Sequence, residues 1–589
     1  MKNRLPILAT VLMLMQGCNS NLDLLPKDQL TIPTAFVDYN GFQTYAWSFY
    51  NVFPGYSESV PTSDIDGDLF LNANPNGQSK WAYRQIIVPS SSEDYNGPYQ
   101  NIRAINIMLD NIDASKLSDT DKLHWRSVGY FFRAFNYANL LNKYGGVPLV
   151  LKALTDGDQE ELFAPRNSRD EVAKQILADL AFAEANIKPN GDGPNTINSH
   201  VVRAFISRFG LREGTWRKYH EMADAESYLQ ASAEASAKLI TTFPNVTANY
   251  DDDFNSASLA GVTGILLYKQ YETNQIVHVL SSRARQSAGR WDLTKKAADM
   301  YLMTDGKTRF TSPLFEGDKS PYTEFRKRDK RMYYTTPPPF KVTVTGQSWA
   351  HTGVAADAEY FPLMASISNE QHKTLPTMNW GAIPVRHEPH YADDAQGQAF
   401  CVTYTGYRFY KFGNKLVNGL QNVDINDCPI FRMAEIFVNH AEAKYELGAL
   451  DQTTVDNTIN KLRVRGGVAP LEMANIPTDP TRDATVSAVL WEIRRERAIE
   501  LMGEGFRFDD LRRWKKLNYA TERKLGRWIK KGVDVAASAS IPIQDGASEG
   551  YISYEPVSPG EIPAHYYLHP IPTNQIVLNP KMEQNPGWE

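Results

Sequence analysis

A long patterned segment in the first half of the chain decides the fold class. Its sequence is DTDKLHWRSVGYFFRAFNYANLLNKYGG, from Asp119 to Gly146. Apolar and aromatic residues recur at intervals of three and four, which is the spacing of one face of an α-helix. Asp119 or Asp121 can cap the first turn, and the pair Gly145 and Gly146 ends the helix. The segment therefore predicts an α-helix with an apolar face.

The segments that follow repeat this pattern. SRDEVAKQILADLAFAEANI begins at Ser168, and Glu171 stands three residues later, so the two residues form a predicted capping box. NSHVVRAFISRFGLREGTW and ADAESYLQASAEASAKLITTF predict two further helices with short connections. Helices joined in this way form antiparallel hairpins that stack. We therefore assign residues 34–243 to a helical scaffold.

The composition changes in residues 244–427. Gly, Pro, Asn, Thr and Tyr become frequent, and helical spacing is rare apart from TKKAADMYLM. TTPPPFKVTVTGQSW and YTGYRFYKFG predict short strands between turns. A loop-rich region of this length is more often functional than idle. We expect this region to carry the ligand surface.

Helical spacing returns in residues 428–518, and residues 519–589 are again rich in loops. The helical segments are PIFRMAEIFVNHAEAKYELGAL, VDNTINKLRVRGG and AVLWEIRRERAIELMGEGFRFDDLRRW. In the first of them Ala434, Ala441, Ala443 and Gly448 form a pattern of small residues that resembles a tetratricopeptide hairpin. The sequence thus predicts a mostly α-helical fold with a few short strands.

The N-terminal segment has the layout of a lipoprotein signal. Lys2 and Arg4 precede an apolar run over residues 5–15, which is too short to span a bilayer. Gly17 then supplies a small residue before Cys18, whose acylated thiol would anchor the mature chain. We expect a signal peptide over 1–17, a lipidated tether over 18–33 and one body over 34–589. An ordinary signal peptide with an incidental cysteine is the alternative.

Charge and cysteine content restrict the partners and the chemistry. The formal charge is −6, and it becomes −8 when Lys2 and Arg4 leave with the signal. An acidic chain without a basic tail argues against nucleic acid as a partner. Besides Cys18 the chain has Cys401 and Cys428, and the sequence leaves their pairing open. No second apolar run is long enough to be a transmembrane helix.

One helix carries carboxylates at the spacing of an enzyme site. Glutamates stand at steps of four along a single face. Glycosidases and di-metal sites both require carboxylates grouped in this way. Arginines lie within one turn of them, and Arg495 and Arg497 stand three residues from a glutamate. No histidine is present to serve as a metal ligand. We interpret the face as a structural salt-bridge network, with a glycoside hydrolase as the alternative; the glutamates are Glu492, Glu496, Glu500 and Glu504.

Other motifs for metal or phosphate are incomplete. DIDGD at Asp64 to Asp68 has the charge of a calcium loop but not its glycine position, which favours a surface turn. In RHEPH, Pro389 breaks the helix that would aim His387 and His390 at one zinc. The chain has no G-x-S-x-G elbow and no G-x-G-x-x-G fingerprint. We predict no catalytic residue, no metal and no cofactor, and we leave calcium binding open.

Aromatic residues in polar, turn-rich surroundings are the remaining candidates for a binding site. A flat ring stacks on the apolar face of a sugar, while neighbouring polar groups bond its hydroxyls. Any single ring of this kind is more often a packing residue than a ligand contact. The candidate residues are Trp81, Tyr83, Trp291, Trp349, Tyr360, Trp380 and Tyr391.

Sequence blocks along most of the chain resemble the SusD/RagB family. In the first half these blocks are LDLLPKDQLT, YQNIRAINIMLDNI, YFFRAFNYANLLNKYGGVPLV and PRNSRDEVAKQILADLAFA. In the second half they are LTKKAADMYLMTDGK, RDKRM, IFRMAEIFVNHAEAKYELG, INKLRVRGG, RRERAIELMGEGFRFDDLRRW and LHPIPTNQIVLNPKMEQNPGW. Lys330 replaces a family proline, and Trp588 stands where the family often has Tyr.

The resemblance implies a tetratricopeptide-like scaffold of helical pairs with an irregular loop-rich ligand-binding portion. It also implies a non-catalytic surface lipoprotein that captures an oligosaccharide and passes it to a SusC-like TonB-dependent transporter in the outer membrane. Cys18 would be the lipid anchor. Capture of peptide or another nutrient is the alternative within the same role. The resemblance does not supply ligand residues, because those vary among family members.

Overall fold

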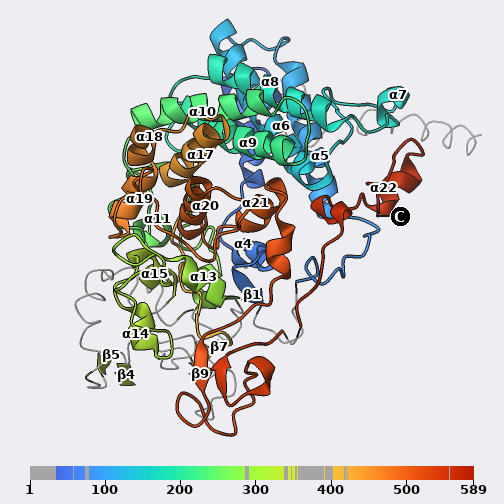
Figure 1. The fold of residues 1–589 in the computed structure, drawn as a ribbon. Coiled ribbons are helices and arrows are strands. Elements are labelled where there is room, and N and C mark those ends of the chain that lie inside the picture. Colours follow the sequence, from blue (N-terminus) through green and yellow to red (C-terminus); the bar gives the residue numbers. More distant parts are fainter. Residues whose placement is uncertain are drawn as a thin grey trace, which may run out of the picture.

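The computed structural model describes most of the body of the chain. The described residues are 35–57, 59–72, 79–284, 291–336, 342–345, 348–351, 355, 390–391, 402–414, 416, 420, 422–555 and 557–588. Helices dominate these ranges, and the strands are short, which confirms the predicted fold class (Figure 1). No helix in these ranges is both long and apolar enough to cross a membrane.

The N-terminal helices pack as successive antiparallel neighbours. Helix α5 packs against α6, α6 against α8, and α9 against α10. The predicted helix α6 begins at Asp119 as expected, but Ser118 caps it by accepting a hydrogen bond from the Asp121 backbone N–H. Gly145 ends it with φ of +74°, a conformation that favours glycine. The bounds are α3 Tyr39–Ala46, α5 Glu93–Asn111, α6 Asp119–Tyr144, α7 Gln159–Leu162, α8 Arg169–Asn186, α9 Ser199–Tyr219 and α10 Ala225–Thr242.

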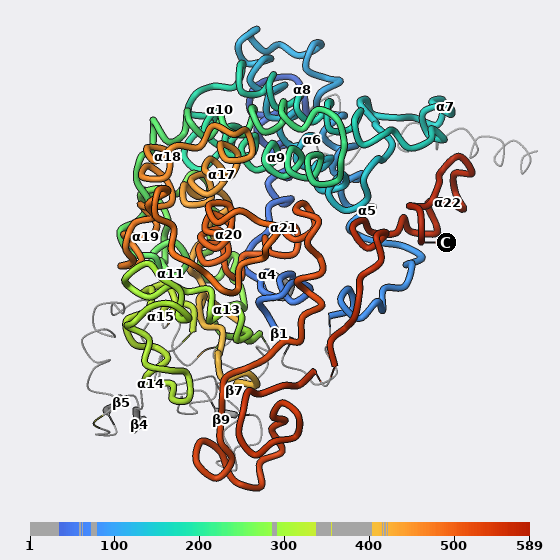
Figure 2. The backbone as a smooth tube through the Cα atoms, in the orientation of Figure 1, coloured from blue at the N-terminus to red at the C-terminus, as the bar shows by residue number. Residues whose placement is uncertain are grey.

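The later helices return to the same scaffold. Helix α17 packs on α9, α10 and α20, so it joins the two helical segments of the chain (Figure 2). Close approach of α9 and α10 depends on Gly210 and Gly214, where an added Cβ would lie 2.6 Å from the Tyr228 carbonyl oxygen and 2.7 Å from Leu229. The bounds are α17 Met433–Glu446, α18 Gln452–Asn457, α19 Ile459–Arg465, α20 Ala488–Glu500 and α21 Arg507–Arg513.

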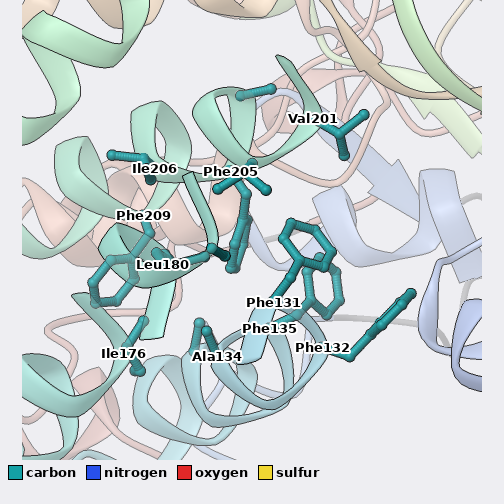
Figure 3. Close-up of a cluster of buried hydrophobic side chains, with 14 of the residues drawn as sticks. Phe131, Phe132, Ala134, Phe135, Ile176, Leu180, Val201, Phe205, Ile206 and Phe209 are labelled. Atoms are coloured by element: carbon teal, nitrogen blue, oxygen red, sulfur yellow. The ribbon is translucent and has the colours of Figure 1, made fainter. Parts of the chain in front are cut away.

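The core of the scaffold is aromatic and aliphatic. Phe131 and Phe135 of α6 meet Phe205 of α9, with ring centroids 5.7 Å and 4.8 Å apart. Ile176 and Leu180 of α8 complete the cluster, and all five side chains are buried (Figure 3). The recurrence at three and four in the sequence is therefore the packed face of these helices.

The strands form two-stranded pairs. Strand β2 pairs with β8 in antiparallel register, which connects the loop-rich segment to the start of α17. Strand β4 and the start of its antiparallel partner β5 lie in TTPPPFKVTVTGQSW, as predicted. YTGYRFYKFG forms no strand: β7 ends just before it, and its bridge from Arg408 to Asp292 is isolated, so that strand prediction was wrong. The bounds are β1 Phe70–Asn72, β2 Ile265–Lys269, β3 Trp291–Leu293, β4 Val342–Thr345, β5 Ser348–His351, β6 His390–Tyr391, β7 Val402–Thr403, β8 Cys428–Arg432, β9 Trp528–Lys530 and β10 Glu549–Tyr551.

Short helices are spread through the loop-rich segments. TKKAADMYLM forms α13, as its spacing predicts. The bounds of the short α-helices are α4 Ser59–Thr62, α11 Asp252–Asn255, α12 Leu280–Ala284, α13 Lys295–Met300, α14 Pro321–Phe325, α15 Lys330–Thr335 and α22 Thr573–Leu578. Single 3₁₀ turns are η1 Trp47–Val52, η2 Ser63–Asp66, η5 Leu517–Thr521, η6 Gln544–Gly546 and η7 Ala564–Tyr567.

Candidate functional site

The glutamate face of α20 and the turn after it is a buried ionic network. Glu492 accepts from Arg463 at 2.6 Å and from Arg495 at 3.1 Å. The second contact is the three-residue pair that the sequence predicts. Arg497 differs from the prediction, because it pairs with Asp510 at 2.7 Å instead of with Glu500. Asp510 lies on α21, which packs on α9.

Glu500 is the most heavily bonded carboxylate of this network. Arg432 and Arg465 each lie 2.6 Å from it, and Arg331 lies 3.0 Å away. Burial opposes ionisation, but these three guanidinium groups hold the pKa of Glu500 well below its usual range. Glu504 likewise pairs with Arg432 and with Lys411, both at 2.6 Å.

The two central glutamates are enclosed by the protein and ion-paired with arginine. Glu496 and Glu500 are fully buried, and Arg331 lies 2.5 Å from Glu496. The described residues also contain no group of three or more His, Cys, Asp or Glu side chains placed to hold a metal ion. The interpretation as a structural network is confirmed by the paired carboxylates.

The DIDGD motif is buried, so its prediction as a surface turn was wrong. Asp64 accepts hydrogen bonds from the backbone N–H groups of Gly505 and Arg507, at 3.2 Å and 3.0 Å. The Asp68 carboxylate accepts hydrogen bonds from both Nε and Nη2 of Arg507, at 2.7 Å and 2.9 Å. The first N–H groups of a helix have no partner within the helix, and Asp64 supplies one at α21. The motif joins the N-terminal segment to the ionic network.

Two of the predicted ligand aromatics are interior packing residues in this structure. Trp81 is 5% exposed and meets Tyr566 edge-to-face, with ring centroids 5.3 Å apart. Trp291 is 3% exposed and lies on β3, where it pairs with Asn72 of β1. Neither ring offers an open face to a ligand here. Tyr83, by contrast, is half-buried.

The other predicted site residues lie outside the part of the chain whose side chains are described. Trp349 and Tyr391 fall on the backbones of β5 and β6. The remaining residues of this group, Tyr360, Trp380, Cys18 and Cys401, lie outside the described residues altogether. Cys428 is buried, and its thiol donates to the Pro429 carbonyl oxygen.

Three half-buried tyrosines, one from the N-terminal segment and two from the loop-rich segments, form the candidate binding surface. We call Tyr83, Tyr404 and Tyr554 the tyrosine ledge. The rings of Tyr404 and Tyr554 meet edge-to-face, with centroids 5.5 Å apart. The hydroxyl of Tyr83 donates to the Val557 carbonyl oxygen at 3.4 Å, which places this ring beside the segment that carries Tyr554.

Backbone hydrogen bonds fix the segments that carry the ledge. The buried carboxylate of Asp292 accepts from the backbone N–H groups of Tyr404 and Thr405, at 2.6 Å and 3.1 Å. The N–H of Arg527 donates to the Thr405 carbonyl oxygen, and the N–H of Ile552 donates to the Arg527 carbonyl oxygen. Three chain segments therefore lie side by side, and Asp292 of β3 anchors the first of them.

Polar groups accompany the ledge. Arg523 donates through Nε to the Ser553 hydroxyl at 2.9 Å and to the Glu555 carbonyl oxygen at 2.7 Å. Burial raises the pKa of the Glu555 carboxyl, and the nearby Lys524 ammonium partly offsets this. Burial also raises the pKa of Tyr83, as does the negative charge of Glu555. Ring faces held in place can stack on a sugar, and the ionic groups beside them can bond its hydroxyls.

Sequence reasoning missed two members of the ledge. Tyr404 lies in YTGYRFYKFG, which was predicted to contain a short strand between turns. Tyr554 lies in GYISYEPVSPG, which is rich in Gly, Pro and Ser. The criterion that selected Tyr83, an aromatic residue in turn-rich surroundings, would have selected Tyr554 as well.

Comparison with known proteins establishes the family. The model of the SusD family matches residues 267–588, which is more than half of the chain. A second model, described as starch-binding and associating with the outer membrane, matches residues 47–211. The chain belongs to the SusD family.

Curated relatives match only segments of the chain. SusD-like protein P38 of Formosa agariphila is 30% identical over 129 residues, which cover 21% of this chain and 25% of the relative. SusD-like protein P2 of the same organism is 21% identical over 208 residues, covering 33% of this chain and 41% of the relative. The matched segments thus span less than half of these relatives.

Solved structures share the whole fold. A SusD-like protein from Bacteroides fragilis has a TM-score of 0.64 at 19% identity, over 93% of this chain and 97% of its own. A SusD-like carbohydrate-binding protein from the same species has 0.65 at 18%, over 93% and 100%. A laminarin-binding SusD-like protein has 0.55 at 16%, over 94% and 100%. These likenesses confirm the tetratricopeptide-like helical fold.

Proposed function

We propose that this SusD-family protein is a non-catalytic glycan-binding lipoprotein of the outer membrane surface. The tyrosine ledge is the observation that carries the proposal, because it sets aromatic ring faces beside fixed polar groups. Two solved structures with the same fold are named as carbohydrate-binding and laminarin-binding proteins, which supports a saccharide ligand. Acylation of Cys18 would hold the body on the membrane.

The ligand would bind by stacking on the rings and would dissociate readily. A few ring faces and hydrogen bonds give modest affinity, which suits a protein that hands its ligand to a SusC-like TonB-dependent transporter. Trp349, Tyr360, Trp380 and Tyr391 are proposed as further ring contacts. Trp81 and Trp291 would position the surrounding segments, since their rings are buried.

Calorimetric titration of the lipid-free Cys18→Ser chain tests the proposal. The chain is titrated with oligosaccharides from starch and laminarin and with a panel of peptides. Tyr404→Ala or Tyr554→Ala should weaken binding of the preferred glycan about fivefold, because a stacked aromatic contact contributes about 1 kcal/mol. Chromatography of the same samples should show the glycan unchanged.

The matched control is Trp47→Ala, an aromatic side chain 49% exposed on η1 in the helical scaffold. This variant should bind the glycan as tightly as the unmodified chain. Equal affinity in the ledge variants would remove the ledge from the binding site. Binding of peptides and of no glycan would establish the alternative nutrient class, and released sugar would establish a hydrolase.

A further inference from the structure

A second concave surface lies between α5, α7 and α22, far from the tyrosine ledge. It encloses a volume of about 490 Å³. Helices α7 and α22 lie at one side of the scaffold, well separated from β7 and β9 of the loop-rich portion (Figure 1). We call this surface the α5–α22 groove; its apolar lining includes Tyr99, Val150, Leu154, Phe163, Leu578 and Met582.

The rim of the groove exposes large apolar side chains. Leu162 and Phe163 follow one edge, with 42% and 39% of their surface exposed. Val577 and Leu578 form the opposite edge on α22, with 82% and 67% exposed. Contiguous apolar surface at a concave site is typical of a place where another apolar group binds.

Polar groups at the groove suit a polypeptide main chain. The amides of Gln575 and Asn96 bond each other at 3.1 Å, and the Asn579 amide donates to the Ala164 carbonyl oxygen at 2.8 Å. Each of these amide side chains has further donor or acceptor capacity. Arg103 is exposed and donates to the Leu154 carbonyl oxygen, and no described carboxylate lies within ion-pair distance of it. The groove therefore favours a segment that carries both leucines and an acid.

The chain itself supplies such a segment before Ala35. Residues 18–34 read CNSNLDLLPKDQLTIPT. They contain five branched aliphatic residues within eleven positions, which is a high density for a linker that stays in water. Asp23 and Asp28 could pair with Arg103, and Pro26 disfavours a helix at the residue before it. The aliphatic residues are Leu22, Leu24, Leu25, Leu30 and Ile32.

The path of the described chain puts this segment within reach. The ring of Phe36 lies 4.7 Å from that of Tyr45, and the Tyr45 hydroxyl donates to the carbonyl oxygen of Ala104 on α5. Ala104 directly follows Arg103, which lines the groove. The groove residues of α5 extend about 12 Å from there to Tyr95. Seventeen extended residues span up to about 56 Å, so the distance is no obstacle.

We propose that residues 22–32 dock in the α5–α22 groove, with their leucines on its apolar lining and an aspartate on Arg103. Burial of the leucines on this lining offsets part of the cost of ordering the segment. Docking shortens the link between Cys18 and the body, and holds the body close to the membrane. This consequence rests on the proposed lipid anchor, whereas the docking itself does not.

Hydrogen exchange of the Cys18→Ser chain, starting at residue 18, tests the docking. Amides of residues 22–32 should exchange at least tenfold more slowly than in a free peptide of the same sequence. The double variant Leu162→Asp and Leu578→Asp should restore peptide-like rates, because it places charge on both edges of the groove. Both side chains are exposed, so the body should stay folded.

The matched control is Val464→Asp on α19, whose side chain is 64% exposed. It should leave the protection of residues 22–32 unchanged. Peptide-like rates in the unmodified chain would overturn the proposal, as would full protection in the groove variant. Protection that rises with protein concentration would assign the groove to a second copy and overturn it too. Glycan affinity at the tyrosine ledge should be the same in the groove variant, so the two proposals fail separately.

Discussion

Helices α6 and α20 are both buried, but they are stabilised by opposite kinds of interior. Phe131, Phe135 and their neighbours on α6 contact other rings and aliphatic side chains. Glu496 and Glu500 on α20 contact arginines from distant parts of the chain. Apolar contacts are non-directional and tolerate small shifts, whereas each buried charge requires its partner in place. The two helices should therefore respond differently to loss of one side chain.

The largest effect is expected at Glu500 in the ionic interior. Glu500→Ala leaves the guanidinium groups of Arg331, Arg432 and Arg465 buried without their shared carboxylate. The free energy of unfolding should fall by about 5 kcal/mol, as for other broken buried ion pairs. Denaturant titration followed by circular dichroism measures this change. Glu160→Ala on α7, an exposed position, is the control, and a similar small loss in both variants would contradict the role of the network.

A smaller effect is expected at Phe131 in the apolar interior. Phe131→Ala removes a fully buried ring that contacts Phe205 and Phe132. The free energy of unfolding should fall by about 4 kcal/mol from lost burial and the cavity that remains. The same titration measures it, and Phe131→Leu should recover most of the loss because it refills the volume. Equal losses in the two variants would mean that ring volume is not what matters there.

The smallest effect is a pH dependence at Asp64, where the DIDGD motif meets α21. Burial raises the pKa of this carboxyl to about 7, although the N–H groups of Gly505 and Arg507 favour the charged form. Between about pH 4 and 7 the folded chain holds a proton that the unfolded chain releases, so stability falls as the pH rises. From pH 5 to 7 the contribution of Asp64 should fall by about 2 kcal/mol.

Asp64→Asn should remove this part of the pH dependence, because the amide does not ionise in this pH range, although its single oxygen can accept only one of the two backbone hydrogen bonds. Denaturant midpoints at pH 5, 6 and 7 for the variant and the unmodified chain measure the difference. Asp113→Asn, on a carboxylate 82% exposed, is the control. Parallel pH profiles for the unmodified chain and Asp64→Asn would show that Asp64 ionises normally when the chain is folded.

Prediction from sequence succeeded where local contacts decide the structure. The capping box of Ser168 and Glu171 is present, and both of its hydrogen bonds form. The glutamate face of α20 was correctly assigned to salt bridges, and the Glu492–Arg495 pair was found from its spacing alone. Arg497 was assigned the wrong partner, because its spacing from Glu500 carries no information about the position of α21.

The candidate site was predicted less well, for a related reason. An aromatic residue in a turn-rich segment can face solvent or fill the interior, and the choice depends on which other segments pack beside it. Trp81 is covered by residues near the C-terminus, among them Tyr566 and Trp588. Tyr404 stays half-exposed because Asp292, more than a hundred residues away, fixes its backbone at the surface.

The sequence by itself determined the helical scaffold, its caps and the ordered blocks that mark the family, because helix periodicity and capping act within a few residues. Only the tertiary structure decided which charges meet in the ionic interior and which tyrosines form the ledge. It also decided that the DIDGD carboxylates are buried against α21. Those outcomes depend on contacts between residues hundreds of positions apart, such as Asp68 with Arg507, and their spacing in the sequence carries no trace of them.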